Sequence, residues 1–312
     1  MSSTAAASYD AVAKSRSGDL SSKDVPFRHF NNYVKKYLIQ YALDGLRASQ
    51  LSMKSISVLD LASGRGGDVG KWLFMQSPPV QSKASDALRI SQYECYDISP
   101  DSISEAKGRY QKMKGQSQCT ANFYVADCFS DVFLSTDLPT NPFYGKFGVV
   151  SIQFALHYAC FSKERVQELL EVIAQSLDTN GFFIATTVNP YELSSRVKTG
   201  SLSNSLFNVE LLASPVWDSD SDALLAAGTK YQFKLDGFVD CPEYLVPLDY
   251  IRTVAPSLGL RECTDASKPF GDFLVTYSSD RRITKATFYL QMKEHCRHCT
   301  IRFVFRRFRR GQ

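Results

Sequence analysis

The sequence predicts an α/β fold of the Rossmann-like kind, in which a mostly parallel central sheet carries helices on both faces. Residues 58–72, VLDLASGRGGDVGKW, pass from an apolar run into a glycine cluster and then into apolar residues at helical spacing. This order is typical of the first strand–turn–helix unit of a nucleotide-binding domain. Strand-like and helix-like segments then alternate as far as residue 188, and such alternation favours parallel strand pairing.

Length and composition are consistent with one large α/β domain that carries insertions. The chain has 312 residues, of which 44% are hydrophobic, and its net charge is +4. Residues 1–25 are polar and rich in Ser and Ala, so we expect a disordered leader before a folded domain at 26–312. No apolar run reaches the roughly 18 residues of a membrane span, so we expect no membrane partner. The small net charge means that any contact with nucleic acid is local.

The elements follow from periodicity and from capping residues. Strands are expected at 56–61, 92–98, 123–127, 147–154 and 182–188, within a core sheet at about 54–190. Helices are expected at 27–39, opened by Pro26, at 99–110, where Ser99 precedes Pro100, and at 162–177. Residues 191–312 would add insertions and the last strands: a Ser-rich insertion at 194–221, a strand pair at 230–240, a helix at 247–258, and strands at 273–277 and 301–305.

Eight cysteines are spread along a chain with no secretory signal, which favours reduced thiols. Six of them stand beside apolar residues, and we expect small core side chains there: Cys95, Cys119, Cys128, Cys160, Cys241 and Cys263. The stretch at 295–299, HCRHC, would place four ligands within five residues. Because that spacing strains a tetrahedral zinc site, we expect no metal there.

Polar side chains follow three of the predicted strands. Asp97 ends the second strand, Asp127 ends the third, and Gln153, His157 and Tyr158 come at or after the end of the fourth. Ligands of open α/β sheets bind at these carboxyl ends. Acids and an amide–aromatic pair suit the ribose and base of a nucleoside. The acids also tolerate a positively charged sulfonium better than a pyrophosphate, so the pattern favours S-adenosylmethionine over a dinucleotide.

The carboxyl-terminal segment at 302–312 interleaves arginines with three phenylalanines. A basic, aromatic end of this kind suits contact with RNA phosphates and bases. A solvated tail that aids solubility fits the same pattern, and the sequence leaves both interpretations open.

The chain resembles the eukaryotic mRNA cap guanine-N7 methyltransferases. The matching stretches include FRHFNNYVKKYLI, VLDLASGRGGDVGKW, YDISPDSISEAKGRY, FGVVSIQFALHYAC and YQFKLDGFVDCPEYLV, in family order over residues 27–250. The resemblance implies a class I S-adenosylmethionine-dependent methyltransferase fold, with 26–312 as its catalytic domain. Where the family usually has Gly-Cys-Gly-Lys, this chain has Ala62, Ser63, Gly64 and Arg65. A small alanine keeps the turn and arginine keeps the charge, so activity is expected.

The resemblance also implies roles for individual residues. The expected contacts of S-adenosylmethionine are Lys35, Ala62, Gly64, Asp97, Asp127, Gln153 and Tyr158. The expected contacts of the cap are Asn31, Asn32, Arg65, Lys71, Arg109, His157, Glu243 and Tyr289. Glu243 and His157 would position the guanine, and no residue would act as an acid or base. Capped RNA is the expected partner, with capping enzyme or the RNA polymerase II machinery as protein partners, and the nucleus is the expected location.

Two other functions are compatible with the same fold. The chain could be a cap- or RNA-binding regulatory subunit that retains the fold, an alternative supported only by Ala62 and Ser63. It could also be a methyltransferase that acts on a small molecule or a protein. The Asn31–Asn32 pair and the Cys241-Pro242-Glu243 stretch argue against this second alternative.

Overall fold

The computed structural model describes residues 24–77, 87–200, 203, 207–219, 221–235, 239–273, 277 and 300–308. Its centre is an open sheet in the order β12-β13-β6-β5-β1-β3, and β2 and β4 pair with β3. The strands are β1 (Ser55–Leu61), β2 (Gln76–Ser77), β3 (Leu88–Asp97), β4 (Thr120–Val125), β5 (Phe147–Gln153), β6 (Leu177–Val188), β12 (Leu260–Glu262) and β13 (Thr300–Arg307). The neighbours from β4 to β6 are parallel, whereas β2, β12 and β13 run antiparallel to their partners. This arrangement confirms the predicted Rossmann-like fold.

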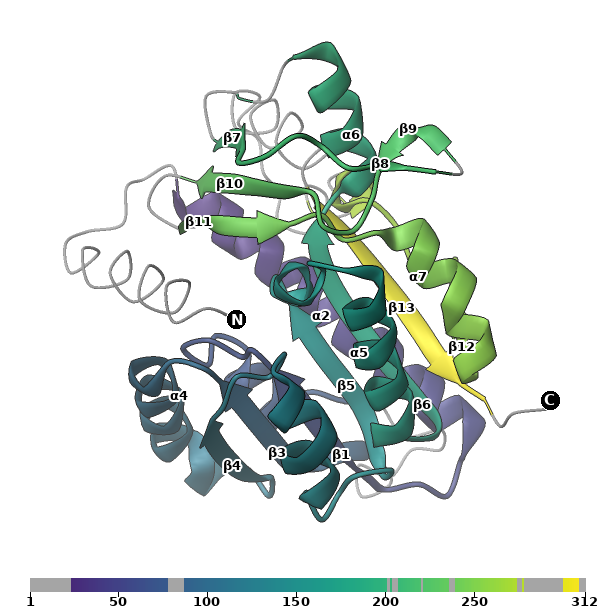
Figure 1. Cartoon of the computed structure of the whole chain (residues 1–312). Coiled ribbons are helices and arrows are strands. Elements are labelled where there is room, and N and C mark those ends of the chain that lie inside the picture. The colour runs from purple at the N-terminus through teal and green to yellow at the C-terminus, as the bar shows by residue number, and fades with distance from the viewer. Residues whose placement is uncertain are drawn as a thin grey trace.

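Helices cover both faces of this sheet (Figure 1). On one face α2 (Asp24–Ser49) packs with α3 (Val69–Phe74), and on the other face lies α5 (Lys163–Ser176). The strands supply alternate residues to the two cores: Val58 and Val149 face α2, whereas Leu59 and Val150 face α5. This two-residue alternation is what a strand buried on both faces requires. None of the described helices is long and apolar enough to cross a membrane.

The second half of the chain adds a smaller sheet beyond the carboxyl ends of the central strands (Figure 1). It contains β7 (Phe207–Leu211), β10 (Lys230–Leu235) and β11 (Val239–Tyr244), in the order β11-β10-β7 and all antiparallel. The predicted strand pair is therefore confirmed, and its turn at 236–238 lies outside the described residues. β8 (Trp217–Asp218) and β9 (Ser221–Leu225) form a separate hairpin. The helix expected at 247–258 is α7 (Leu248–Val254), followed by the 3-10 helix η6 (Ala255–Leu258).

One sequence prediction was wrong in this half, and one helix was not predicted. The strand expected at 273–277 is absent at both of its ends, because Phe273 closes the 3-10 helix η7 (Phe270–Phe273) and Tyr277 is helical. The Ser-rich insertion begins with a helix, α6 (Pro190–Thr199). Asn189 caps α6 by accepting hydrogen bonds from two backbone N–H groups, and Gly200 ends it at φ 70°. These caps outweigh the modest helix propensity of serine.

The basic segment at 302–308 belongs to the central sheet. β13 pairs with β6 from Thr300 to Arg306, and Phe303 and Phe305 are buried in the α5-side core. Arg302 is only 1% exposed, and its guanidinium lies over the rings of Phe273 and Tyr37 at 3.6 and 4.4 Å. Residues 302–308 are therefore not a solvated tail, and the strand predicted at 301–305 is confirmed as part of β13 (Thr300–Arg307). Residues 309–312, the leader at 1–23 and the 295–299 stretch lie outside the described residues.

The expected role of the cysteines holds for five of the six that the sequence placed in the core. Cys95, Cys119, Cys128, Cys160 and Cys241 are buried free thiols, and Cys263 is half-buried.

Candidate active site

The carboxyl ends of four central strands meet at one edge of the sheet. Leu61 of β1 is in register with Tyr96 of β3 and with Ile152 of β5, and Asp97 is in register with Val125 of β4. The residues that follow these positions therefore lie side by side. This register brings Ala62, Asp97, Asp127 and Gln153 to the same edge, as the sequence predicted.

The turn after β1 is held in a left-handed conformation. Ala62, Gly64 and Gly66 have φ values of 54°, 57° and 71°. A Cβ at Gly66 would come within 2.7 Å of the Ala106 side chain, so this position requires glycine, both for its φ and for its close approach to α4 (Pro100–Met113). Below the turn, buried Asp60 accepts hydrogen bonds from Tyr93 Oη at 2.7 Å and Trp72 Nε1 at 3.2 Å, which fixes α3 beneath the loop.

Asp97 is bound to the turn by backbone hydrogen bonds. Its Oδ2 accepts from the Gly64 N–H at 2.8 Å, and its Oδ1 accepts from the Ser99 N–H at 2.9 Å. A carboxylate oxygen can accept more than one hydrogen bond, so a ribose hydroxyl is a chemically suitable further donor to this group. Asp127 accepts from the Phe129 N–H at 3.1 Å. Both acids are thus fixed at the strand ends by backbone donors.

A buried acid that the sequence analysis did not single out, Asp68, joins α2 to the glycine turn. Its carboxylate contacts Lys35 Nζ at 2.7 Å and Lys71 Nζ at 2.5 Å. Although burial by itself would raise the pKa of Asp68, the two lysines hold it below its ordinary value. Lys71 Nζ also donates to Asn32 Oδ1 at 2.7 Å and to the Gly67 carbonyl at 3.1 Å. All three N–H donors of Lys71 are used here, which leaves none for a phosphate.

The loop after β5 positions the remaining cofactor candidates. The Gln153 amide donates to Ser151 Oγ and accepts from Thr186 Oγ1, so β6 fixes its side chain. Phe154 follows with φ 59°, a strained value for a large side chain. Tyr158 Oη contacts Cys241 Sγ of β11 at 3.3 Å. This contact ties the cofactor edge to the smaller sheet.

Two buried titratable side chains face one another between the central edge and the smaller sheet. His157 lies on the 3-10 helix η5 (Leu156–Ala159), and its Nε2 is 3.5 Å from Glu243 Oε1 on β11. The two side chains are 5% and 4% exposed. Burial lowers the pKa of His157 to about 3 and raises that of Glu243 to about 8. Both groups are therefore mainly neutral at pH 7 in the free protein, and 3.5 Å is too long for a strong hydrogen bond.

Only one hydrogen bond satisfies this pair within the described residues. Tyr231 of β10 donates from its hydroxyl to Glu243 Oε2 at 3.1 Å, and Tyr231 and Glu243 are partners in the β10–β11 register. Neither ring nitrogen of His157 has a hydrogen-bond partner in the described part of the chain. Buried polar groups are rarely left unpaired. The unmet ring nitrogens make this pair a candidate contact for a polar ligand.

Two cationic side chains meet at one carboxylate, Arg65 from the glycine turn and Arg109 from α4. Arg65 and Arg109 each form an ion pair with Glu105 of α4, at 2.9 and 2.6 Å. Lys71, predicted like them to contact the cap, donates instead to Asp68 and Asn32. Asn31, from the same turn of α2 as Asn32, has a buried Oδ1 without a partner among the described residues. Tyr289 lies outside the described residues.

Sequence reasoning missed Asp68, Tyr231 and Glu105. Asp68 could have been found, because an acid directly after a glycine-rich turn stands beside the ligand-binding edge. Tyr231 could have been found only from the register that pairs it with Glu243. Glu105 stands one helical turn before Arg109, a spacing usual for surface ion pairs, so nothing distinguished it.

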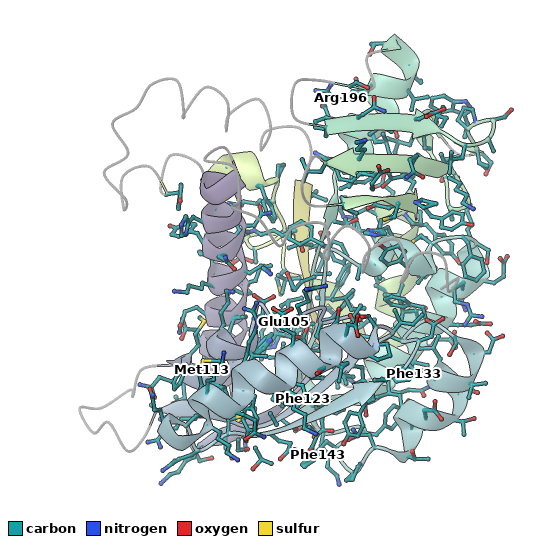
Figure 2. The ribbon with its side chains drawn as sticks, turned by 90° about the vertical axis from the view of Figure 1, so that its left-hand side faces the viewer. Glu105, Met113, Phe123, Phe133, Phe143 and Arg196 are labelled. Carbon is teal, nitrogen blue, oxygen red and sulfur yellow. The ribbon has the colours of Figure 1, made fainter. Side chains whose placement is uncertain are left out.

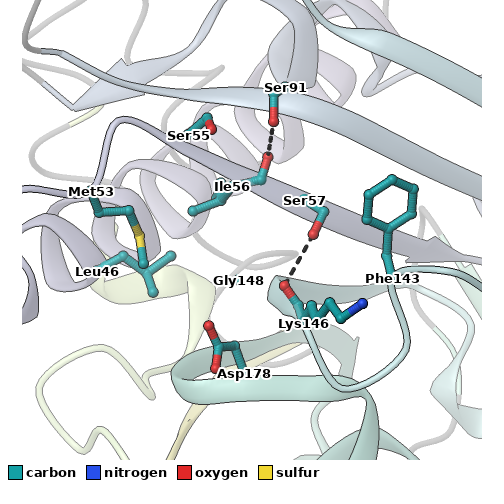
Figure 3. A pocket seen from close by; sticks show the side chains of 10 residues that line it. All are labelled: Leu46, Met53, Ser55, Ile56, Ser57, Ser91, Phe143, Lys146, Gly148 and Asp178. Carbon is teal, nitrogen blue, oxygen red and sulfur yellow. Dashed lines mark hydrogen bonds between the residues drawn. The ribbon is translucent and has the colours of Figure 1, made fainter.

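A cavity of about 190 Å³ lies at the other end of the central strands and is not the site (Figure 3). It is lined by residues at the start of β1 and β5. Two of its three serine hydroxyls are already satisfied, since Ser57 Oγ donates to the Lys146 carbonyl at 3.0 Å and Ser91 Oγ to the Ile56 carbonyl at 3.2 Å. None of the lining side chains has a buried polar atom that lacks a hydrogen-bond partner.

The strand order and the acid-bearing carboxyl edge define a class I S-adenosylmethionine-dependent methyltransferase fold. The residues at the edge fit that cofactor: carboxylates replace the phosphate-binding glycine pattern of a dinucleotide site, and Asp97 can accept from a ribose. The chain belongs to the mRNA (guanine-N(7))-methyltransferase domain family, whose model matches residues 2–301.

Named relatives agree with this family. The mRNA cap guanine-N(7) methyltransferase of Schizosaccharomyces pombe is 33% identical over 80% of this chain and 63% of its own length. The protein of the same name from Drosophila melanogaster is 29% identical over 75% of this chain and 52% of its own length. The chain thus spans about half to two thirds of the length of these curated relatives. A S-adenosylmethionine-dependent methyltransferase structure from Clostridium acetobutylicum is 13% identical over 88% of this chain and 92% of its own, with a TM-score of 0.48, a likeness too low to support a conclusion.

Proposed function

We propose that this chain transfers the methyl group of S-adenosylmethionine to N7 of the terminal guanosine of capped RNA. The observation that carries the proposal is the buried His157–Glu243 pair, in which neither ring nitrogen of His157 has a hydrogen-bond partner among the described residues. The partners of the chain would be capped RNA and, in the nucleus, capping enzyme or the RNA polymerase II machinery.

The cofactor contacts are proposed as follows. Asp97 would accept the ribose hydroxyls, and Asp127 and the Gln153 loop would hold the base. The backbone at Ala62 and Gly64 would line the near side, with Lys35 and Asp68 at the amino-acid end of the cofactor and Tyr158 beside it. When bound, S-adenosylmethionine supplies an electrophilic methyl group. The residues of the chain orient it and exclude water.

The guanine contacts follow from donor and acceptor chemistry. The Glu243 carboxylate would accept hydrogen bonds from guanine N1–H and from the N2 amino group, replacing the solvent that burial has removed. It would also offset the positive charge that develops on the ring during transfer. His157 would contact the ring edge, and Asn31, Asn32 and Tyr289 would complete the cap side. Arg65 and Arg109 would hold the triphosphate bridge.

The reaction needs no general base, because N7 carries a lone pair and no proton. The role of the chain is to hold the attacking nitrogen in line with the methyl group at near-attack distance. Such positioning can lower a barrier by about 7–11 kcal/mol. Lys71 would act through Asp68 and Asn32 rather than on the phosphates, since its donors are saturated in the free protein.

The test is methyl transfer from labelled S-adenosylmethionine to GpppG-capped RNA, with uncapped RNA and RNA with a pre-methylated cap as controls. We expect label in N7-methylguanosine on the capped RNA alone. Tight cofactor binding without transfer would favour the regulatory-subunit alternative. Transfer to a small molecule in preference to capped RNA would reject the cap as substrate.

A further inference from the structure

One carboxylate of α4 contacts two arginines that come from different elements. Glu105 Oε2 accepts from Arg65 Nη1 at 2.9 Å, and Glu105 Oε1 accepts from Arg109 Nη2 at 2.6 Å. Arg65 belongs to the glycine turn, whereas Arg109 lies on α4 itself. Glu105 lies on the side of α4 that faces the middle of the molecule (Figure 2). Each carboxylate oxygen therefore serves one guanidinium.

An ordinary helix ion pair does not account for this arrangement. Glu105 and Arg109 alone would form a common i, i+4 pair on an exposed helix face. Arg65, however, brings a second positive charge to the same point, and two guanidinium groups repel one another unless an anion lies between them. Although burial opposes it, Arg109 and Arg65 hold the pKa of Glu105 below its ordinary value, so the carboxylate is ionised at neutral pH.

The terminal N–H groups that Glu105 occupies are the ones through which arginine binds phosphate. A carboxylate that accepts from two guanidinium groups resembles, in charge and in geometry, a phosphate bound between the same two groups. With Glu105 in place, the two arginines present a net charge of about one rather than two. A phosphate ligand must therefore take these donors from Glu105 before it can use both of them.

We propose that Glu105 is a built-in competitor for phosphate at the Arg65–Arg109 pair, which it holds in the free protein and releases when the substrate's triphosphate bridge binds. The identity of that substrate rests on the proposed function. Because Glu105 is part of the chain, it lowers the affinity of the Arg65–Arg109 pair for every phosphate ligand by the same factor. It also recaptures the arginines as the product leaves, which speeds release.

The test is calorimetric binding of inorganic tripolyphosphate and of GpppG to the wild-type chain and to Glu105→Gln. We expect the variant to bind both ligands about threefold to tenfold more tightly, by equal factors, since two partly exposed ion pairs no longer have to break. S-adenosylmethionine affinity should be unchanged. Asp178→Asn, which removes one negative charge at the opposite end of the sheet, is the matched control and should bind like the wild type.

A second variant separates competition from mere loss of charge. Glu105→Asp keeps the charge but shortens the side chain by one methylene, so it cannot reach both arginines. The affinity of this variant for tripolyphosphate should lie between those of the wild type and Glu105→Gln. Unchanged or weaker tripolyphosphate binding by Glu105→Gln would overturn the proposal and make Glu105 a support that presents the arginines. An equal gain in tripolyphosphate affinity by Asp178→Asn would mean that the change in net charge, and not competition by Glu105, causes the effect. Tripolyphosphate binding requires no turnover, so failure of the wild type to methylate capped RNA would count against the proposed function alone.

Discussion

The two halves of the site are built in opposite ways. At the cofactor edge the acids already hold backbone donors: Asp97 binds the Gly64 and Ser99 N–H groups, and Asp127 binds that of Phe129. In the proposed guanine pocket, formed by His157 and Glu243, both side chains are buried, and the two ring nitrogens of His157 have no hydrogen-bond partner within the described residues. One half is assembled by the fold before any ligand arrives, whereas the other stays incomplete without one.

The difference has an energetic consequence. A carboxylate fixed by backbone N–H groups is retained by the fold itself, so its loss disturbs the turn as well as the ligand. A buried carboxyl without a full set of partners contributes little to folding and destabilises the pocket until a ligand satisfies it. Variants of the guanine pocket should therefore lose activity more than stability, and variants of the cofactor edge should lose both.

Glu243→Ala should produce the largest effect. Loss of the carboxylate removes the acceptor for two guanine donors and the charge that offsets the forming cation, so kcat/KM for capped RNA should fall about 10²- to 10³-fold. Calorimetry should show S-adenosylmethionine affinity near the wild-type value, and thermal unfolding should show little change. Equal losses of cofactor binding and transfer would contradict the separation of the two halves.

Asp97→Asn should weaken binding of the cofactor rather than of the cap. The amide keeps the size of the side chain but loses the charge and one acceptor, so S-adenosylmethionine should bind about tenfold to a hundredfold more weakly, the effect of one charged hydrogen bond. Affinity for GpppG should change little. Thermal stability should fall, because Gly64 and Ser99 lose a charged acceptor. An unchanged cofactor affinity would reject the ribose role of Asp97.

The pH profile of the wild type tests the guanine pocket without a mutation. Burial raises the pKa of Glu243 to about 8, and only the ionised form accepts from guanine N1–H and N2. The value of kcat/KM should therefore rise about tenfold per pH unit below pH 7 and level off above about pH 8, as expected when the free enzyme must lose one proton. His157, with a pKa of about 3, is neutral across this range. A value of kcat/KM that does not change from pH 6 to pH 8 would contradict the inference that Glu243 is protonated in the free enzyme.

Glu243 should also make the stability of the folded protein depend on pH, with stability falling as pH rises. A carboxyl whose pKa is raised on folding holds its proton in the folded state at pH values where the unfolded chain has lost it. Its contribution to stability is thus complete below the unfolded pKa of about 4.5 and declines as pH rises towards 8. Activity and thermal stability should consequently change in opposite directions between pH 5 and pH 8.

The sequence correctly predicted that Asp97 and Asp127 lie at one edge of the sheet, because its signals there are local. Asp97 and Asp127 end recognisable strands, and parallel pairing brings such ends together whatever the rest of the chain does. The fold class followed from the same alternation. The α6 helix was missed because two caps, Asn189 and Gly200, outweigh a serine-rich composition. The strand predicted at 301–305 is part of β13, and the sequence could not tell a tail from a core strand at 302–308 because its arginines alternate with buried phenylalanines.

The guanine pocket could not be derived from the residues alone. His157 and Glu243 lie on separate elements far apart in the sequence, and only the resemblance to a family indicated that they act together. Lys71 looked available for phosphate because its pairing with Asp68 and Asn32 depends on how α2 packs against the glycine turn. Tyr231 acquires its role from a strand register, which composition and spacing do not specify.

Tyr231→Phe should give the smallest effect and the sharpest separation of the two halves. The hydroxyl donates to Glu243 Oε2 at 3.1 Å and lowers the pKa of that carboxyl. Its removal should therefore shift the rise of kcat/KM to higher pH, with a loss of about threefold to fivefold at pH 7, the size of one hydrogen bond, and recovery above pH 9. Cofactor affinity should be unaffected. Phe233→Leu, at the next inward-facing position of β10, is the matched control, and its pH profile should superimpose on that of the wild type. A loss in Tyr231→Phe that persists at high pH would mean that the hydroxyl orients the guanine pocket rather than tuning its charge.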